Sequence, residues 1–240
     1  MNPMPAWLAL TCRLLLIALV PVALTLTNVR LLMTPLFPNF EYNLPGFPLD
    51  LYGFTKEDRL KWSKVAIDYL LNNAGIEFLA GLRFPEGQTA PLESCGDYTT
   101  RDCTYLYNDR ELRHMVDVKN VTRGALWVWG VGGVMVLLSA GALFYFGERA
   151  ALRAGLLWGA GITLVFYLGI ILYIAVNFNS LFVQFHQVFF ESGTWLFLWS
   201  DTLIRLFPVR FWQDTFIFIG GASLAEALVV GAGAWWGIRP

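Results

Sequence analysis

Four nearly uncharged apolar stretches constrain the fold of this 240-residue chain more than any other feature of its sequence. They cover approximately residues 10–29, 124–147, 154–176 and 215–236. Each is close to the roughly 20 apolar residues that an α-helix needs to cross a bilayer. Hydrophobic residues make up 56% of the chain, which is too apolar for an ordinary soluble domain. The sequence therefore predicts an all-α integral membrane protein with four transmembrane helices in a single membrane domain, the first an uncleaved anchor.

The basic residues beside these stretches predict which side of the membrane each loop faces. Arg149 and Arg153 lie in the short loop between the second and third stretches, Arg13 begins the first, and Arg239 follows the fourth. Cytoplasmic loops carry an excess of Lys and Arg. We therefore expect these four residues, and both termini, to be cytoplasmic.

Two segments are then expected outside the cytoplasm: residues 30–122, a helical, loop-rich extracytoplasmic segment, and residues 177–214, an interfacial aromatic segment. Cys95 and Cys103 bracket a short loop in the first of them. An oxidising compartment permits a disulfide there. A zinc site is the alternative, but two cysteines without a nearby histidine make a poor one. Cys12 is expected to be inert packing.

Segment 30–122 is expected to contain two helices. The order Thr55-Lys-Glu-Asp58 is typical of a capping box at a helix start. An apolar face follows at helical spacing, formed by Trp62, Val65, Ala66, Tyr69 and Leu70. This helix should end around residues 72–75, and a second helix over 109–121 should run directly into the second apolar stretch.

The chain has only two histidines, His114 and His186, and both fall in the segments expected outside. Imidazole takes or gives a proton near neutral pH. Glu111, His114 and Asp117 recur every three residues and would share one face of a helix. A neighbouring carboxylate fixes the tautomer of an imidazole and stabilises its charged form, as a general base requires. The alternative interpretation is an interfacial histidine within a surface ladder of ion pairs.

His186 lies in a segment that is crowded with aromatic residues and poor in charges. Aromatic rings gather at the headgroup level of a membrane, so an anchoring belt is one interpretation of residues 177–214. A site that acts on a lipid ester would also have to lie at this level. Within the segment, Thr194–Phe207 is expected to form an amphipathic stretch in the plane of the interface, with Asp201 and Arg205 as its polar positions.

Glu226 is an ionisable residue inside the fourth apolar stretch, where such residues are by default functional candidates. Its glycine and alanine neighbours instead favour close helix packing. We expect a structural role, with Glu226 paired to Arg13 or reaching the cytoplasmic edge.

The order of these segments and their motifs resembles the lipoprotein intramolecular transacylase (Lit) family. The resemblance covers nearly the whole chain. Its motifs are Gly53-Phe-Thr55-x-Glu-Asp-Arg59 before Asp68-Tyr69-Leu70; Glu111-x-x-His114-Met-x-Asp117-Val118; and Phe185-His186-x-x-Phe189-Phe190, followed by Trp195 and by Leu206-Phe207-Pro208-x-x-Phe211-Trp212.

The resemblance implies a membrane enzyme of the bacterial cell envelope. Its reaction would move the sn-2 acyl chain of a diacylglyceryl-cysteine onto the α-amino group of the same cysteine, giving an N-acylated lyso-lipoprotein. The implied partners are a diacylated lipoprotein N-terminus and membrane lipids, the site faces outward, and no cofactor or metal is required. The family's two functional histidines fall on His114 and His186, while the Cys95–Cys103 loop departs from the family pattern.

The chemistry needs a base to keep the amine neutral and a proton for the departing glycerol oxygen. We expect His114 to be the base, oriented by Asp117 or Glu111, and His186 to be the acid or the oxyanion partner; the assignment can be reversed. Candidates for polarising the carbonyl or lining the lipid are Arg110, Arg113, Asn177, Asn179, Phe185, Phe189 and Trp195. An acyl-enzyme through Ser180 or Tyr173 is less favoured, because the substrate carries its own nucleophile.

Other function classes fit the sequence less well. A net charge of −1 offers no basic stripe for nucleic acid. A transporter would show polar residues through the middle of its spans, and here two spans are almost purely apolar. A non-catalytic membrane scaffold would tolerate the loss of both histidines. A phospholipid acyltransferase or hydrolase would act on free phospholipid.

Overall fold

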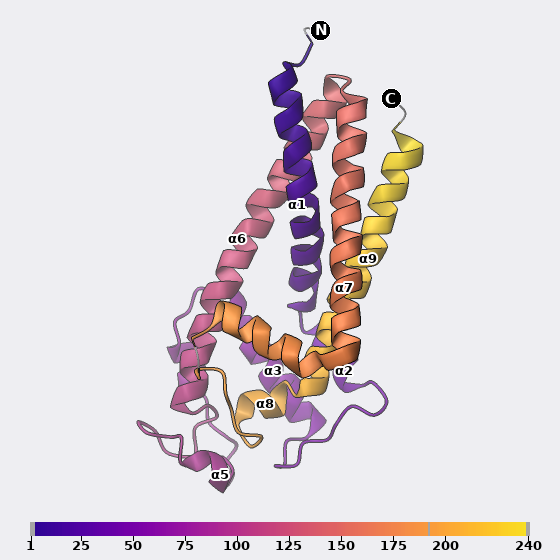
Figure 1. The fold of residues 1–240 in the computed structure, drawn as a ribbon. Helices are drawn as coiled ribbons and strands as arrows, with labels where there is room; N and C mark the ends of the chain where they lie inside the picture. The colour runs from indigo at the N-terminus through magenta and orange to yellow at the C-terminus, as the bar shows by residue number, and fades with distance from the viewer. Residues whose placement is uncertain (1–2, 192, 239–240) are drawn as a thin grey trace. The chain divides into compact units, whose positions relative to one another are not determined.

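A computed structural model describes residues 3–191 and 193–238 of the chain, and the elements it assigns in these ranges are helices joined by loops (Figure 1). A single antiparallel bridge, between Arg83 and Tyr105, is the only strand-like pairing in the described part. The helices are α1 (Ala6–Leu32), α2 (Leu36–Tyr42), α3 (Lys56–Leu71), α4 (Glu77–Ala80), α5 (Leu92–Cys95), α6 (Asp109–Tyr145), α7 (Arg149–Phe189), α8 (Thr202–Leu206), α9 (Val209–Ala232) and a terminal π-helical turn, Gly233–Gly237.

Four of these helices are long and apolar enough to cross a membrane: α1, α6, α7 and α9 with its π-helical turn. The prediction of an all-α protein with four membrane-spanning helices is confirmed. Helix α6 also confirms that the charged segment from Asp109 onward continues without a break into the second span. Helix α7 is bent at Asn177, whose φ of −159° and ψ of 83° are not helical.

The chain divides into two compact units. The first contains the chain up to Leu31, Ala125–Asn177 and the part from Phe216 onward, and it therefore holds the apolar spans. The second contains Leu32–Gly124 and Phe178–Thr215. These two ranges nearly coincide with residues 30–122 and 177–214, the segments that were predicted to lie between the spans, and they include both histidines.

In the first unit, small residues let α1 and α7 approach closely. A Cβ added to Gly155 would lie 3.0 Å from the Cβ of Leu16, and one added to Gly159 would lie 2.9 Å from the Cβ of Val20. Because lipid tails are as apolar as the side chains, helices in a membrane associate mainly through such close packing. The two glycines, one turn apart, are therefore required by the contact between these helices.

Glu226 of α9 has a different partner from the one predicted. Asn28, only 1% exposed, donates from its side-chain nitrogen to Glu226 Oε2 at 2.9 Å and to Ser223 Oγ at 3.1 Å. The predicted pairing with Arg13 is wrong, because this amide on α1 supplies the hydrogen bond that a carboxyl group inside a span requires. Glu226 thus joins α9 to α1.

In the second unit, α3 begins and packs as its sequence predicts. Thr55 accepts a hydrogen bond from the Asp58 backbone N–H at 3.1 Å, and the Asp58 carboxylate accepts one from the Thr55 N–H at 2.9 Å. This reciprocal capping box satisfies two of the backbone donors that are free at a helix start. The chain leaves the helix at Asn72, within the predicted range.

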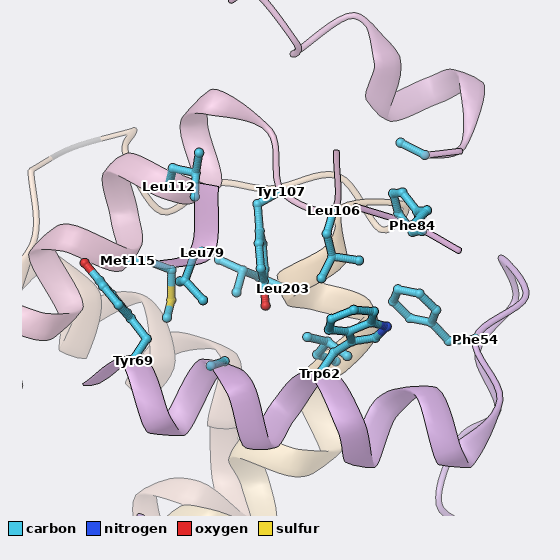
Figure 2. Close-up of a cluster of buried hydrophobic side chains, with 13 residues drawn as sticks. Phe54, Trp62, Tyr69, Leu79, Phe84, Leu106, Tyr107, Leu112, Met115 and Leu203 are labelled. Atoms are coloured by element: carbon cyan, nitrogen blue, oxygen red, sulfur yellow. The ribbon is translucent and has the colours of Figure 1, made fainter. Parts of the chain in front are cut away.

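The predicted apolar face of α3 forms one side of the core of the second unit (Figure 2). Trp62 and Tyr69 of α3 lie in the same buried cluster as Leu112 and Met115 from the first turns of α6. Burying large side chains of this kind stabilises the fold by roughly 1.5–3 kcal/mol each. The core therefore fixes the start of α6, the segment that carries His114.

Candidate active site

The second unit brings the two histidines together. The rings of His114, on α6, and His186, on the part of α7 after the bend, have centroids 6.3 Å apart and planes inclined by 21°. Each residue is only 8% exposed. Two buried imidazoles at this separation can act on one small group held between them.

Aromatic rings surround His114. Phe190 contacts it edge-on with centroids 4.9 Å apart, and Phe197 does so at 5.3 Å. The Nδ1 atom of His114 is shielded from water and has no hydrogen-bond partner. Burial, and secondarily the neighbouring His186, lower the pKa of His114 to about 4. His114 is therefore a neutral imidazole at pH 7.

His186 has an aromatic surround of its own and one fixed hydrogen bond. Phe182, Trp195 and Phe185 have ring centroids 4.1, 4.9 and 5.6 Å from its ring. Its Nδ1 atom lies 2.8 Å from the backbone carbonyl oxygen of Phe182. A carbonyl oxygen can only accept, so Nδ1 carries the proton and the Nε2 lone pair is available as a base. Burial lowers the pKa of His186 as well.

The predicted carboxylate partners of His114 do not orient it. Glu111 is fully buried and accepts hydrogen bonds from the backbone N–H groups of Asn108 at 2.9 Å and Leu203 at 2.6 Å. Asp117 is partly buried and makes no hydrogen bond to the imidazole. The prediction that either carboxylate fixes the tautomer of His114 is therefore wrong. Equal spacing along a helix placed the three residues near one another, but tertiary contacts turn Glu111 toward α8.

The role of Glu111 is to cap α6. The Glu111 N–H donates to the Asn108 side-chain oxygen at 2.9 Å, while the Glu111 carboxylate accepts from the Asn108 N–H. Burial, and then the negative charge of Asp201, raise the pKa of Glu111 to about 8, while hydrogen bonds from the two N–H donors act in the opposite direction. The order Asn108-x-x-Glu111 before an apolar helix is a capping-box signature, so this arrangement was readable from the sequence although we did not predict it.

Arg110 is committed to an ion-pair network and does not point freely at a substrate. One guanidinium nitrogen lies 2.5 Å from Asp97 and 2.9 Å from Asp201. Asp201 is buried and also accepts from the Asn108 side chain and from the Leu198 N–H. The predicted use of Arg110 to polarise a carbonyl is therefore not supported.

The other predicted substrate-binding residues lie around the pair or apart from it. Phe185 and Trp195 contact His186, and Phe189 packs against Phe185 with centroids 4.9 Å apart. Arg113 and Asn179 are exposed, and neither bonds to an imidazole. Asn177 lies at the bend of α7, within the first unit.

Residues Thr194–Phe207 were predicted to form an amphipathic stretch with Asp201 and Arg205 as its polar positions, and the predicted exposure of these two residues is wrong. Only Thr202–Leu206 is helical, and both predicted polar positions are buried. Asp201 belongs to the Arg110 network, and Arg205 forms an ion pair of 3.0 Å with Asp50. A lone charge inside a protein is costly, so such residues occur in pairs. The partners of Asp201 and Arg205 lie far away in the sequence, so the local sequence gave no sign that these two charges are buried.

Cys95 and Cys103 form the predicted disulfide, with Cα atoms 5.5 Å apart, and Cys12 is free and buried. Over residues 3–191 and 193–238, the structure shows no group of three or more His, Cys, Asp or Glu side chains arranged to hold a metal ion.

Four helices able to cross a membrane define a multi-pass membrane protein, and the buried imidazole pair on α6 and α7 is its candidate acid–base site. The chain belongs to the family of the lipoprotein intramolecular transacylase Lit, whose family model matches residues 12–212. Membership places it among the lipoprotein intramolecular transacylases in general.

Individual proteins agree with this assignment. An uncharacterised protein of Aquifex aeolicus is 28% identical over 223 residues, which is 90% of each chain. The solved structure of the membrane-integral lipoprotein intramolecular transacylase Lit from Bacillus cereus has the same fold, with a TM-score of 0.72 over 95% of this chain and 94% of that one, at 20% identity. A variant of that protein with one histidine replaced by arginine matches with a TM-score of 0.64 at 19% identity, over 95% and 91%.

Proposed function

We propose that this protein transfers the sn-2 acyl chain of a diacylglyceryl-cysteine, at the N-terminus of a bacterial lipoprotein, to the α-amino group of the same cysteine. The observation that carries the proposal is the pair of buried imidazoles, 6.3 Å apart, within a surround of aromatic rings. An aromatic surround suits a lipid ester and excludes water, which would otherwise hydrolyse the ester. The products are an amide and a free sn-2 hydroxyl.

His186 is the general base in this proposal. Its Nδ1–H donates to the Phe182 carbonyl, which leaves Nε2 unprotonated and fixes the ring orientation. This carbonyl takes the place that a carboxylate has in a Ser-His-Asp triad. The lowered pKa of His186 keeps the ring neutral, and therefore able to accept a proton, at physiological pH.

His114 is the oxyanion partner. Burying an N–H without a hydrogen bond is rarer than burying a lone pair, so we place the proton of neutral His114 on Nε2 and leave the shielded Nδ1 without one. A neutral imidazole N–H can stabilise a developing oxyanion, as in triosephosphate isomerase. This assignment reverses the base and partner expected from sequence.

The atoms and protons balance without a cofactor. The amine nitrogen attacks the ester carbonyl carbon while His186 Nε2 takes a proton from the nitrogen. His114 Nε2–H stabilises the carbonyl oxygen as it becomes negative. The bond from the carbonyl carbon to the glycerol oxygen then breaks, and the His186 imidazolium returns its proton to that oxygen. Because nucleophile and ester belong to one molecule, folding the lipid back on itself supplies a high effective concentration.

We place the site at the outer face of the cytoplasmic membrane, with both termini inside. The basic residues of the loop between α6 and α7 support this orientation, and so does the disulfide, which needs an oxidising compartment. A lipoprotein exposes its lipid-modified cysteine on that side, so the substrate and the imidazoles meet without crossing the membrane.

The test is mass spectrometry of a diacylated lipopeptide incubated with the purified protein in lipid. Wild type should move one acyl chain to the α-amino group. His186→Ala should abolish transfer, and His114→Ala should lower kcat by about 10²–10³, as loss of an oxyanion donor does. Val188→Ala, an exposed position on the same helical segment as His186, is the control and should leave the rate unchanged.

Two outcomes contradict the proposal. Wild-type protein that leaves the lipopeptide unchanged but deacylates free phospholipid would favour the phospholipid hydrolase alternative. Acyl transfer that survives both histidine substitutions would show that the imidazole pair is not the catalytic site.

A further inference from the structure

The disulfide-closed loop and the residue just before it make three contacts with the residues that support the candidate site. It follows α5 and ends before α6, and both cysteines pack against the core of the second unit. A disulfide stabilises a fold mainly by restricting the unfolded chain. That effect needs no connection to a catalytic site, so the specific contacts of this loop require another explanation.

The first contact is the ion pair of Asp97, two residues after Cys95. Its carboxylate lies 2.5 Å from the Arg110 guanidinium, and the same guanidinium lies 5.6 Å above the ring of Phe197. Phe197 in turn contacts His114 edge-on. Asp97 therefore helps to hold Arg110 in place over Phe197, one of the aromatic rings that surround His114.

The second contact fixes the first residue of α6. Thr99 donates to the Asp109 carboxylate from its backbone N–H at 2.9 Å and from its hydroxyl at 3.0 Å. Thr100 donates to it at 2.9 Å from its N–H and at 2.5 Å from its hydroxyl. Asp109 lies little more than one helical turn before His114, so the loop holds the start of the helix that carries this imidazole.

The third contact reaches the segment that carries Phe197. The hydroxyl groups of Ser94 and Ser200 are joined by a buried hydrogen bond of 2.7 Å. Ser94 precedes Cys95, and Ser200 precedes Asp201, the second carboxylate partner of Arg110. The loop thus contacts the start of α6, and the residue just before the loop contacts the segment that carries Phe197.

We propose that the loop closed by Cys95 and Cys103 is a positioning element for His114, with Asp97 as its positioning residue, and that reducing the disulfide slows acyl transfer. The rate readout rests on the proposed function. A phosphine reductant supplies two electrons to the S–S bond, which gives two thiols and phosphine oxide, with water as the source of oxygen and protons.

The kinetic test compares full-length wild type with and without a phosphine reductant. Reduction should lower kcat about tenfold, and Cys95→Ser/Cys103→Ser should show the same loss without responding to the reductant.

Asp97→Asn should lower kcat about three- to fivefold at nearly unchanged KM. It should also move the acid limb that belongs to His114, which lies below the titration of the substrate amine in a plot of log(kcat/KM) against pH, to higher pH, because a loosened surround admits water to His114. Cys12→Ser and Asp102→Asn are the controls: one removes the free buried thiol, the other an exposed carboxylate of the same loop.

A second readout does not depend on activity. Diethyl pyrocarbonate carbethoxylates accessible neutral imidazoles, and mass spectrometry reports the modification of each histidine peptide. Reduction and Asp97→Asn should each raise the modification rate of His114 several-fold. This measurement keeps its meaning if wild type proves inactive on the lipopeptide, which would overturn only the proposed function.

One set of results would overturn the inference. Reduction and the double cysteine variant would lower the unfolding temperature while kcat, the acid limb and His114 modification stayed at wild-type values. The disulfide would then act only on stability. If reduction unfolds the protein, Asp97→Asn decides the question with the disulfide intact, since unchanged kcat and unchanged modification would overturn the positioning role.

Discussion

The loss of acyl transfer on mild acidification should come from the substrate amine and not from the imidazoles, because both histidines have pKa values below the ordinary value of about 6.5. Burial, and then the charge of the neighbouring ring, lower the pKa of His114 to about 4, and burial also lowers the pKa of His186. Lowering the pH from 7 to 5.5 should therefore leave the His114 ring neutral. The group that does titrate in this range is the substrate, whose α-amino pKa is about 7.7–8.0.

The size of the effect follows from these pKa values. At pH 5.5 an imidazole with an ordinary pKa would be about 90% protonated, whereas His114, with a pKa of about 4, is only about 3% protonated. Titration of the amine alone makes log(kcat/KM) fall with a slope of one below pH 7. An ordinary imidazole would add a second unit of slope below pH 6.5, and a further loss of about tenfold at pH 5.5.

The assay is the initial rate of N-acylation of a diacylated lipopeptide between pH 5 and 8.5, with folding checked by tryptophan fluorescence at each pH. A slope that reaches two near pH 6.5 would refute the argument that burial holds the rings neutral.

The lowered pKa values of the two histidines also affect the stability of the fold. The unfolded histidines bind protons more readily than the folded ones, so the free energy of unfolding should fall as the pH drops below about 6.5.

Two further predictions concern packing and can be checked by thermal unfolding in detergent. Asp50→Asn should destabilise the protein by about 3–5 kcal/mol, because it leaves Arg205 buried beside a neutral group. The control Asp68→Asn, in an exposed ion pair, should cost no more than about 1 kcal/mol. Equal effects of the two substitutions would contradict this reasoning. Gly159→Ala should cost about 1–3 kcal/mol of stability, because its Cβ would lie 2.9 Å from a valine of α1. The control is Gly161→Ala, whose Cβ meets open space. A tolerated Gly159→Ala would show that α1 and α7 can separate.

Local signals in the sequence predicted the long helices and the disulfide correctly, but not the short helices α2, α4, α5 and α8. Uncharged apolar length predicted the four spans, and the capping box at Thr55 predicted the start of α3. The paired cysteines predicted the disulfide. Each of these signals lies within a few tens of residues, where helix geometry and chain stiffness limit the alternatives.

The partners of the polar residues could not be predicted in the same way. Glu111 bonds to the Leu203 N–H, and Glu226 bonds to Asn28, which lies at the other end of the sequence. Buried polar groups need such partners, but any distant donor of suitable shape satisfies the rule. The reversed assignment of the histidines depends on a hydrogen bond to a backbone carbonyl, for which side-chain identity gives no signal.

Because Glu111 is held by its capping contact, the spacing Glu111-x-x-His114 determines where His114 points around the axis of α6. The carboxylate accepts from the backbone N–H of Leu203 on α8 as well as from the Asn108 N–H that it caps, and the contact with α8 restricts the rotation of α6 about its own axis. Successive residues of an α-helix turn by about 100°, and three residues therefore set the direction of the imidazole relative to that anchor. One residue inserted between the two would swing His114 by about 100° and aim it away from His186. The three-residue interval therefore fixes the direction in which His114 points. A homologue can be expected to keep this interval even where the residues inside it change.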